Sequence, residues 1–238
     1  MTWCAGEIKF VIEMTPEINT IFVGGVRIDE PIVTLTDLVI SVLSFFYYFK
    51  MKNSAQSGRT FFYFKYYFLV MGIATAFGGI IGHAFLYAFT FSWKLAGWVI
   101  SMIAIMLIER AAIEHTRILL NDKIINVLRI INIVEFVVFL GLTFYFLDFF
   151  YVELHTAYGL MVVLFSLELL LFIRAKNDAS KFLLMAVVMV GIAAVVFMGR
   201  IVLHQWFNHM ALSHVFMSIA TVLIYKGVMK IDMTKVQV

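Results

Sequence analysis

Charged residues are scarce in this chain. Only 14% of its 238 residues are Asp, Glu, Lys or Arg, whereas about a quarter are charged in a typical soluble domain. Hydrophobic residues make up 63% of the chain, and the mean hydropathy is +0.98. This composition excludes a soluble enzyme and a disordered protein, because neither class is so apolar.

Cysteine, proline and clustered positive charge are also nearly absent. The single cysteine, Cys4, cannot form a disulfide within the chain, which excludes a disulfide scaffold. Only two prolines are present, and together with 25 phenylalanines they complete a composition suited to lipid. The formal net charge of +3 arises from basic residues that stand between apolar runs rather than in one patch, which excludes a binder of nucleic acid.

What the chain does contain is a series of long apolar runs. A helix needs about 20 apolar residues to cross the hydrocarbon core of a membrane, and backbone groups in lipid must be hydrogen-bonded within the segment. Seven runs meet or approach that length, which predicts an all-α bundle of seven transmembrane helices. The predicted helices cover residues 32–49, 63–89, 95–108 with an extension toward 120, 124–147, 155–173, 182–203 and 211–229.

The positions of the basic residues predict the orientation of this bundle. Of the 18 lysines and arginines, 14 lie in segments at one side of the membrane, namely 50–65, 110–129, 174–181 and 226–235. The positive-inside rule makes this side cytoplasmic. We therefore expect the N-terminus outside and the C-terminus inside, in a multi-pass protein of the cell's inner or plasma membrane.

Three regions follow from this topology. Residues 1–31 form an outer N-terminal segment, 32–229 the membrane domain, and 230–238 a cytoplasmic tail. The N-terminal segment is too polar to span the membrane. Its apolar residues recur with partly helical spacing, which favours a short lid on the outer surface.

Ionisable residues in the outer third of the bundle are the first candidates for a functional site, because such residues are costly inside a bilayer. At about 1.5 Å per residue, Asp37 lies about two turns below the outer end of the first helix, and His83 a similar depth below the end of the second. Arg200 lies near the outer end of the sixth helix, and His209 and His214 lie near the start of the seventh.

Three imidazoles that meet in a membrane cavity suit zinc, with a fourth position left for water. Five residues separate His209 from His214, which places them about 140° apart on a regular helix. They can therefore share an ion only if His209 comes from irregular backbone. Two other interpretations remain: the histidines are interfacial anchors or packing residues, or His83 and His214 are the axial ligands of a haem.

The pattern resembles the CREST superfamily of membrane hydrolases, which includes the alkaline ceramidases and the progestin and adipoQ receptors. The segment GGIIGHAFLYAF places His83 at the position of the family's helix-two histidine, and WFNHMALSHVFM places His214 at that of the second helix-seven histidine. The chain departs from the family at Gly79, where a serine is usual, at Lys94, where ceramidases carry aspartate, and at Met210, where the first helix-seven histidine is expected.

This resemblance implies a zinc-dependent hydrolase of a lipid amide or ester. Its zinc ligands would be His83, His209 and His214, while Asp37 would orient or deprotonate the attacking water. Arg200 is expected to steady an anionic head group or an oxyanion. The alternative is a non-catalytic membrane subunit that packs against partner proteins or holds a haem.

A second group of ionisable residues lies deeper or nearer the cytoplasm. Glu135 is close to the middle of the fourth helix, and Glu168 lies in the inner half of the fifth. We expect these groups to pair with nearby arginines or to be protonated in place, with a proton or ion path as the alternative. The group consists of Glu109, Arg110, Glu114, His115, Arg129, Glu135 and Glu168.

Overall fold

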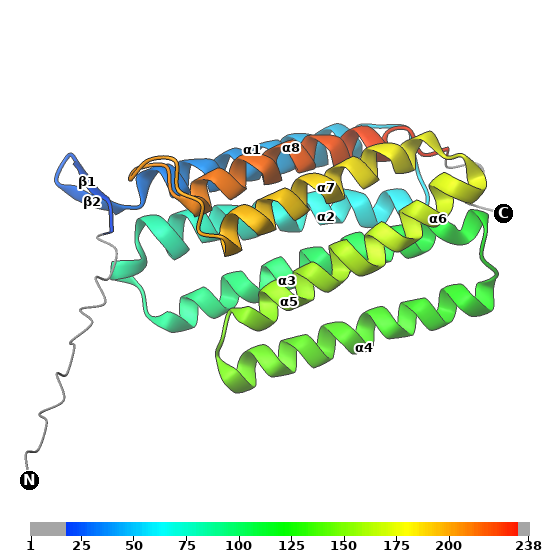
Figure 1. Cartoon of the computed structure of the whole chain (residues 1–238), viewed down its shortest axis with the longest axis horizontal. Helices are drawn as coiled ribbons and strands as arrows, with labels where there is room; N and C mark the ends of the chain where they lie inside the picture. Colours follow the sequence, from blue (N-terminus) through cyan, green and yellow to red (C-terminus); the bar gives the residue numbers. More distant parts are fainter. Residues whose placement is uncertain (1–17, 233–238) are drawn as a thin grey trace, which may run out of the picture.

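The computed structural model describes residues 18–232 and confirms the prediction of a helical bundle (Figure 1). Seven helical spans in this part of the chain are long and apolar enough to cross a membrane. They comprise α1 Pro31–Lys52; α2 Arg59–Phe77 with the π-helical η1 Gly78–Ala84; α3 Phe91–His115; α4 Asp122–Phe146; α5 Phe150–Ala157 with the π-helical η4 Tyr158–Leu164 and α6 Phe165–Ala175; α7 Asp178–Met198; and α8 His209–Val228. Two short 3₁₀ turns, η2 Leu86–Ala88 and η3 Thr116–Ile118, flank α3.

The helices begin where the sequence offers capping side chains. The side chains of Asn121, Asn177 and Asn208 each accept a hydrogen bond from a backbone N–H in the first turn of α4, α7 and α8. Such caps satisfy donors that a helix leaves unpaired at its start. The predicted ranges differ most at the sixth span, where α7 ends at Met198 rather than at residue 203, and at the fifth, which begins at Phe150 rather than at residue 155.

A β-hairpin precedes the first helix, so the expectation of a purely α-helical chain is wrong for this segment. Strands β1 Thr20–Val23 and β2 Val26–Asp29 pair antiparallel. The turn between them is Gly24–Gly25, with φ values of 57° and 82° that favour glycine at both positions. The predicted helical lid is therefore wrong for residues 20–29, and its first 17 residues lie outside the described part of the chain.

An ion pair closes the open end of this hairpin. The Arg27 guanidinium donates two hydrogen bonds to the Asp29 carboxylate, at 2.8 and 2.9 Å, and the Thr20 hydroxyl donates a third at 2.7 Å. These donors favour the charged carboxylate and lower the pKa of Asp29 below its ordinary value. The end of the bundle that carries β1 and β2 is called the hairpin end below.

The spans are arranged in a flattened bundle with α4 at one edge (Figure 1). The apolar core lies among α1, α2, α3, α7 and α8 and includes the fully buried Phe64, Phe68, Ile108 and Leu183. Helix α4 packs against α3 and α5, and most of its apolar side chains face outward. Outward apolar side chains are expected of a helix that faces lipid.

Candidate functional site

Asp37, His83 and His214 meet at the hairpin end of the bundle. Asp37 lies on α1 and is only 7% exposed, His83 lies in the π-helical η1, and His214 lies on α8. Nε2 of His83 is 3.8 Å from Asp37 Oδ2, and Nε2 of His214 is 3.5 Å from Asp37 Oδ1. One carboxylate thus stands between two imidazoles from helices that are distant in sequence.

The other ring nitrogen of each histidine has its own partner. Nδ1 of His83 lies 2.7 Å from Glu30 Oε2, and Nδ1 of His214 lies 3.0 Å from the Thr36 hydroxyl oxygen. The Thr36 hydroxyl donates to backbone carbonyls one turn back, at 2.9 and 3.0 Å, so its oxygen accepts from the imidazole. Both Nδ1 atoms therefore carry a proton, and each Nε2 faces an Asp37 oxygen, toward which it presents a lone pair in the neutral ring and an N–H in the imidazolium.

Local backbone conformation brings these side chains together. Glu30 precedes α1 with a φ of 44°, a left-handed conformation that few residues other than glycine adopt. In η1, a Cβ added at Gly79 would lie 3.0 Å from Asp37 Cβ, and the Thr34 hydroxyl donates to the Gly79 carbonyl at 3.2 Å. Glycine at this position therefore allows the backbone of η1 to pack directly against α1, where a serine would be crowded.

The structure does not bring the other two predicted site residues into this group. The His209 ring packs against Phe197 with ring centroids 5.5 Å apart, and Arg200 is exposed in the turn after α7 with a φ of 49°. Among the described residues, the polar partners of the Asp37 carboxylate are the two imidazoles. In the described part of the chain, neither His209 nor Arg200 forms a hydrogen bond or ion pair with Asp37, His83 or His214, so their roles as zinc ligand and electrostatic stabiliser stay predictions.

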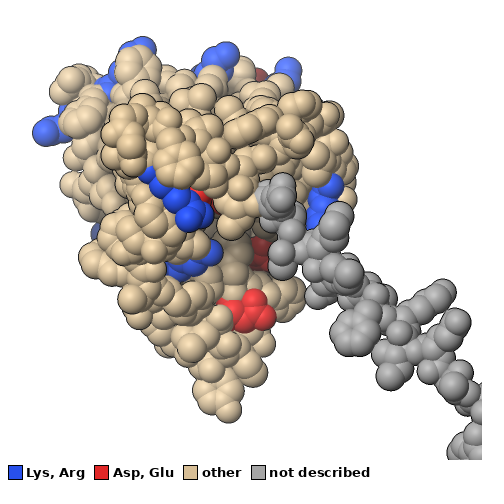
Figure 2. Space-filling model, turned by 90° about the vertical axis from the view of Figure 1, so that its left-hand side faces the viewer, with Lys and Arg blue, Asp and Glu red and all other residues tan. Residues whose placement is uncertain are grey.

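Water can reach the hairpin-end site. The side chains of Glu30 and His83 are both 22% exposed, whereas His214 is 14% exposed. The space-filling view of this end shows acidic and basic side chains around a hollow in the surface (Figure 2). The site is thus partly open at the surface while its central carboxylate is buried.

The deep ionisable residues pair in three groups, of which the first and third are joined by hydrogen bonds through Arg110 and Asn132. Glu114 pairs with Arg129 and Arg117, as expected for an acid near arginines. Glu168 pairs with His115 instead, with Oε1 2.9 Å from Nδ1. The expectation of arginine partners is therefore confirmed for Glu114 and wrong for Glu168.

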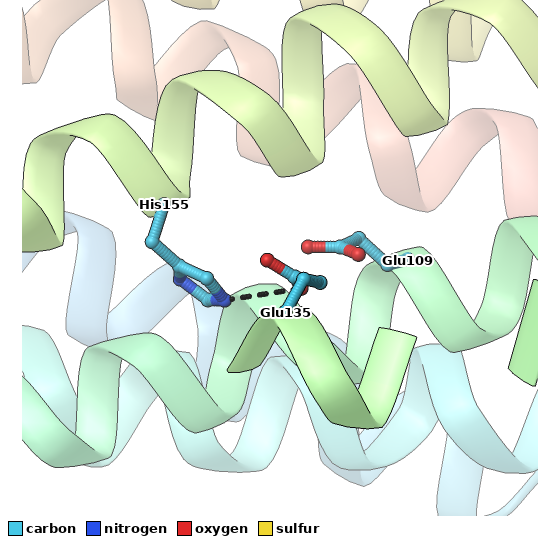
Figure 3. A group of neighbouring side chains, drawn as sticks. All are labelled: Glu109, Glu135 and His155. Carbon is cyan, nitrogen blue, oxygen red and sulfur yellow. Dashed lines mark ion pairs between the residues drawn. The ribbon is translucent and has the colours of Figure 1, made fainter. Parts of the chain in front are cut away.

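Glu109, Glu135 and His155 form the third group, in the interior of the bundle (Figure 3). Their ligand atoms all lie within 4.8 Å of one another, and within the described chain this is the only group of three His, Cys, Asp or Glu side chains with that geometry. Sequence reasoning missed it because His155 was assigned to the outer end of the fifth span and Glu109 to the arginine-rich end of the third.

The fold defines a multi-pass membrane protein with two candidate sites in its helical domain, Asp37/His83/His214 at the hairpin end and Glu109/Glu135/His155 in the interior. The chain belongs to a family of unknown function, DUF6962, whose model matches residues 32–233. The match covers the seven spans apart from Pro31, and it covers every residue of the two candidate sites, while Glu30 lies just outside it. No curated protein and no solved structure matches the chain.

Proposed function

We propose that this protein is a zinc-dependent membrane hydrolase of a lipid amide or ester, with His83, His214 and Asp37 as the zinc ligands. One observation carries the proposal: the Nε2 atoms of His83 and His214 both face the buried Asp37 carboxylate, and no other described side chain donates a hydrogen bond to it. Three acceptors that face one another repel unless a cation or a proton lies among them. Zinc meets this need with ligand types that it prefers.

Each imidazole lies near Asp37, but the ligand atoms of the three side chains do not all lie within 4.8 Å of one another, so binding of one ion by all three requires their side chains to move together. Tetrahedral ligands at about 2.0–2.1 Å from zinc are separated by about 3.3 Å, and the two imidazoles lie 3.5 and 3.8 Å from the Asp37 oxygens. Zinc-bound histidines commonly donate their other N–H to a carboxylate or another oxygen. Glu30 and Thr36 occupy that position for His83 and His214, and they would fix the tautomer of each ring.

Three protein ligands leave a fourth position for water, and bound zinc would lower the pKa of that water to near neutrality. Asp37 then acts as a ligand rather than as the base that its sequence position suggested. The site opens at the end of the bundle, close to the depth of lipid head groups, which favours an amide or ester bond near the head group as the substrate. The arrangement also suits a relative of the CREST hydrolases in which the serine has been replaced by Gly79.

The orientation of the protein belongs to the same proposal. Basic residues end α1, α6 and α8 at the end of the bundle opposite the hairpin, at Lys50, Lys52, Arg174 and Lys226. The positive-inside rule places that end in the cytoplasm and the zinc site at the outer face of the inner or plasma membrane.

A haem at this site is supported less well. A haem with two histidine ligands requires its porphyrin ring between the two nitrogens, and here the Asp37 carboxylate occupies the space that both Nε2 atoms face. The second alternative, a non-catalytic subunit, would keep the fold and lack turnover.

The test combines metal content, an optical spectrum and turnover on the detergent-purified protein. We expect the wild-type protein to bind zinc at this site and to hydrolyse a fluorescent ceramide or a fluorescent phosphatidylcholine. The variants His83→Ala, His214→Ala and Asp37→Asn should each contain one zinc ion per chain fewer and should lose the hydrolysis. His209→Ala is the matched control and should retain both. Size-exclusion profiles show whether each variant is folded.

Three outcomes would contradict the proposal. A Soret band would indicate haem, and bound zinc without hydrolysis of any lipid amide or ester would indicate a structural subunit. Folded His83→Ala and His214→Ala proteins with unchanged metal content would exclude a metal site at the hairpin end.

A further inference from the structure

A second site lies deeper in the bundle, where α3, α4 and α5 meet. Glu109 of α3, Glu135 of α4 and His155 of α5 point toward one another (Figure 3). His155 Nε2 lies 3.4 Å from Glu135 Oε1, without hydrogen-bond geometry. Glu109 and His155 are completely buried, and the Glu135 side chain is 10% exposed.

The polar atoms of this group lack hydrogen-bond partners to an unusual degree. Of the ten buried side-chain nitrogen and oxygen atoms without a partner in the described chain, five belong to these three residues. They are Oε1 of Glu109, both carboxylate oxygens of Glu135 and both ring nitrogens of His155. Native proteins rarely leave such groups unsatisfied, because burial without a hydrogen bond is costly. The two carboxyl groups also face each other closely enough to share a proton, so a buried histidine with two free nitrogens beside them indicates that a cation or a proton lies within the group.

The side chain of the neighbouring Arg110 forms hydrogen bonds with other residues. Arg110 follows Glu109 in the chain, yet its Nε donates to Asn132 Oδ1 and its terminal nitrogen donates to the Arg129 carbonyl, both at 2.9 Å. The Asn132 amide in turn donates to Glu109 Oε2 at 3.1 Å, which leaves Oε1 directed at the rest of the group. Among the described residues, no lysine or arginine forms an ion pair with Glu109 or Glu135.

We propose that Glu109, Glu135 and His155 bind one divalent transition-metal ion. Two carboxylates carry the charge that a divalent ion neutralises, and a mixed set of carboxylate and imidazole ligands suits Mn²⁺, Fe²⁺ and Zn²⁺ better than Ca²⁺ or Mg²⁺. This site is separate from the proposed zinc site at the hairpin end and does not depend on it.

The helices around Glu109, Glu135 and His155 leave room for the Glu109 carboxylate and fix the His155 ring, as binding of one ion requires. Gly159, in the π-helical η4, allows the Glu109 carboxylate to approach the fifth span closely, because an added Cβ would fall against Glu109 Oε1 and 2.5 Å from Ile105. Single π-helical turns occur often at functional sites. The rings of Phe136 and Phe139 pack edge-on against the His155 ring and hold its orientation. Their ring centroids lie 6.0 and 5.6 Å from that of His155.

A metal ion here would tie α4 to the rest of the bundle. Along its 25 residues, α4 fully buries only Ile125, Asn132 and Thr143. A helix with so little buried apolar surface gains much from ligand bonds to its neighbours. The ion would therefore act as a clamp between α4 and the pair formed by α3 and α5.

The test uses the full-length protein with His214→Ala, which removes the hairpin-end site from the measurement. Bound metal is stripped with a chelator, and Co²⁺, Mn²⁺ or Zn²⁺ is then titrated while the visible Co²⁺ spectrum and the melting temperature are recorded. We expect one ion per chain and a melting temperature that rises with ion concentration. Glu109→Gln, Glu135→Gln and His155→Asn should each weaken binding by about 100-fold or more.

Glu168→Gln provides a matched control, because Glu168 is an equally buried carboxylate whose oxygens are both hydrogen-bonded. It should keep the Co²⁺ spectrum and the ion-dependent rise in melting temperature. Glu135→Gln should melt no lower than its parent in metal-free buffer, since it removes an unpaired buried charge, and should not respond to the ion. The proposal is overturned if the His214→Ala protein without further substitution shows neither a Co²⁺ spectrum nor a shift in melting temperature. That result would mean that Glu109, Glu135 and His155 bind protons rather than a metal ion.

Discussion

Replacing Glu168 by glutamine is expected to destabilise the bundle strongly, because this carboxylate is the centre of a buried hydrogen-bonded chain. Asn177 donates from Nδ2 to His115 Nε2 at 3.0 Å, so the imidazole proton is on Nδ1 and is donated to Glu168 Oε1 at 2.9 Å. Ser180 donates to Oε2 at 2.6 Å. The amide of Asn177 is fixed in this orientation because its oxygen accepts from the Ala179 N–H at the start of α7.

The magnitude follows from the two hydrogen bonds to the carboxylate. Each bond to a charged group contributes about 1.5–3 kcal/mol, and a buried donor left without an acceptor costs about 1–3 kcal/mol. Glutamine keeps one acceptor and turns an N–H₂ group toward the donor of either His115 or Ser180. We therefore expect Glu168→Gln to lower the free energy of unfolding by about 2–4 kcal/mol, and Ser180→Ala by about 1–2 kcal/mol.

Denaturant unfolding in detergent, followed by circular dichroism, measures this difference. The double variant Glu168→Gln/Ser180→Ala should lose less than the sum of the two single losses, because the two side chains share one hydrogen bond. A loss below about 0.5 kcal/mol for Glu168→Gln would refute the reasoning, since that is the range of ordinary surface substitutions.

Three further predictions concern other parts of the molecule. Gly159→Ala should displace the Glu109 carboxylate and cost about 1–3 kcal/mol by overpacking, measured by the same unfolding assay; an unchanged stability would contradict the close approach. A cysteine at Asn53 should react with an impermeant reagent only from the cytoplasmic side, and one at Asp148 only from outside; reversed labelling would overturn the proposed orientation. The pKa of Asp29 is lower in the folded hairpin than in the unfolded chain, where it is about 3.9. The ion pair with Arg27 therefore stabilises the hairpin at pH values above about 3.9, and this stabilisation is lost as the pH falls through the pKa of the folded state. Faster amide exchange in the hairpin below pH 4 should disappear in Asp29→Asn, and a pH dependence that persists there would contradict this cause.

The positions of the seven spans could be predicted from the sequence because they depend on composition along the chain. Apolar runs of about 20 residues with few charges leave the backbone no alternative to helix in lipid. Counting residues from the helix ends was also sufficient to place Asp37, His83 and His214 at a common depth, and the structure joins these three.

Which side chains face each other was decided only by tertiary packing. The depth of a residue in the membrane follows from its distance in sequence to the end of its helix, whereas the direction in which its side chain points depends on rotation about the helix axis. The π-helical turns at Gly78–Ala84 and Tyr158–Leu164 break the period of about 3.6 residues from which that direction is predicted. The ring of His209 therefore packs against Phe197, and its predicted role as a ligand stays a prediction. Glu109 and His155 gained a role that no spacing indicated, because they lie on different helices and meet only where α3, α4 and α5 pack together.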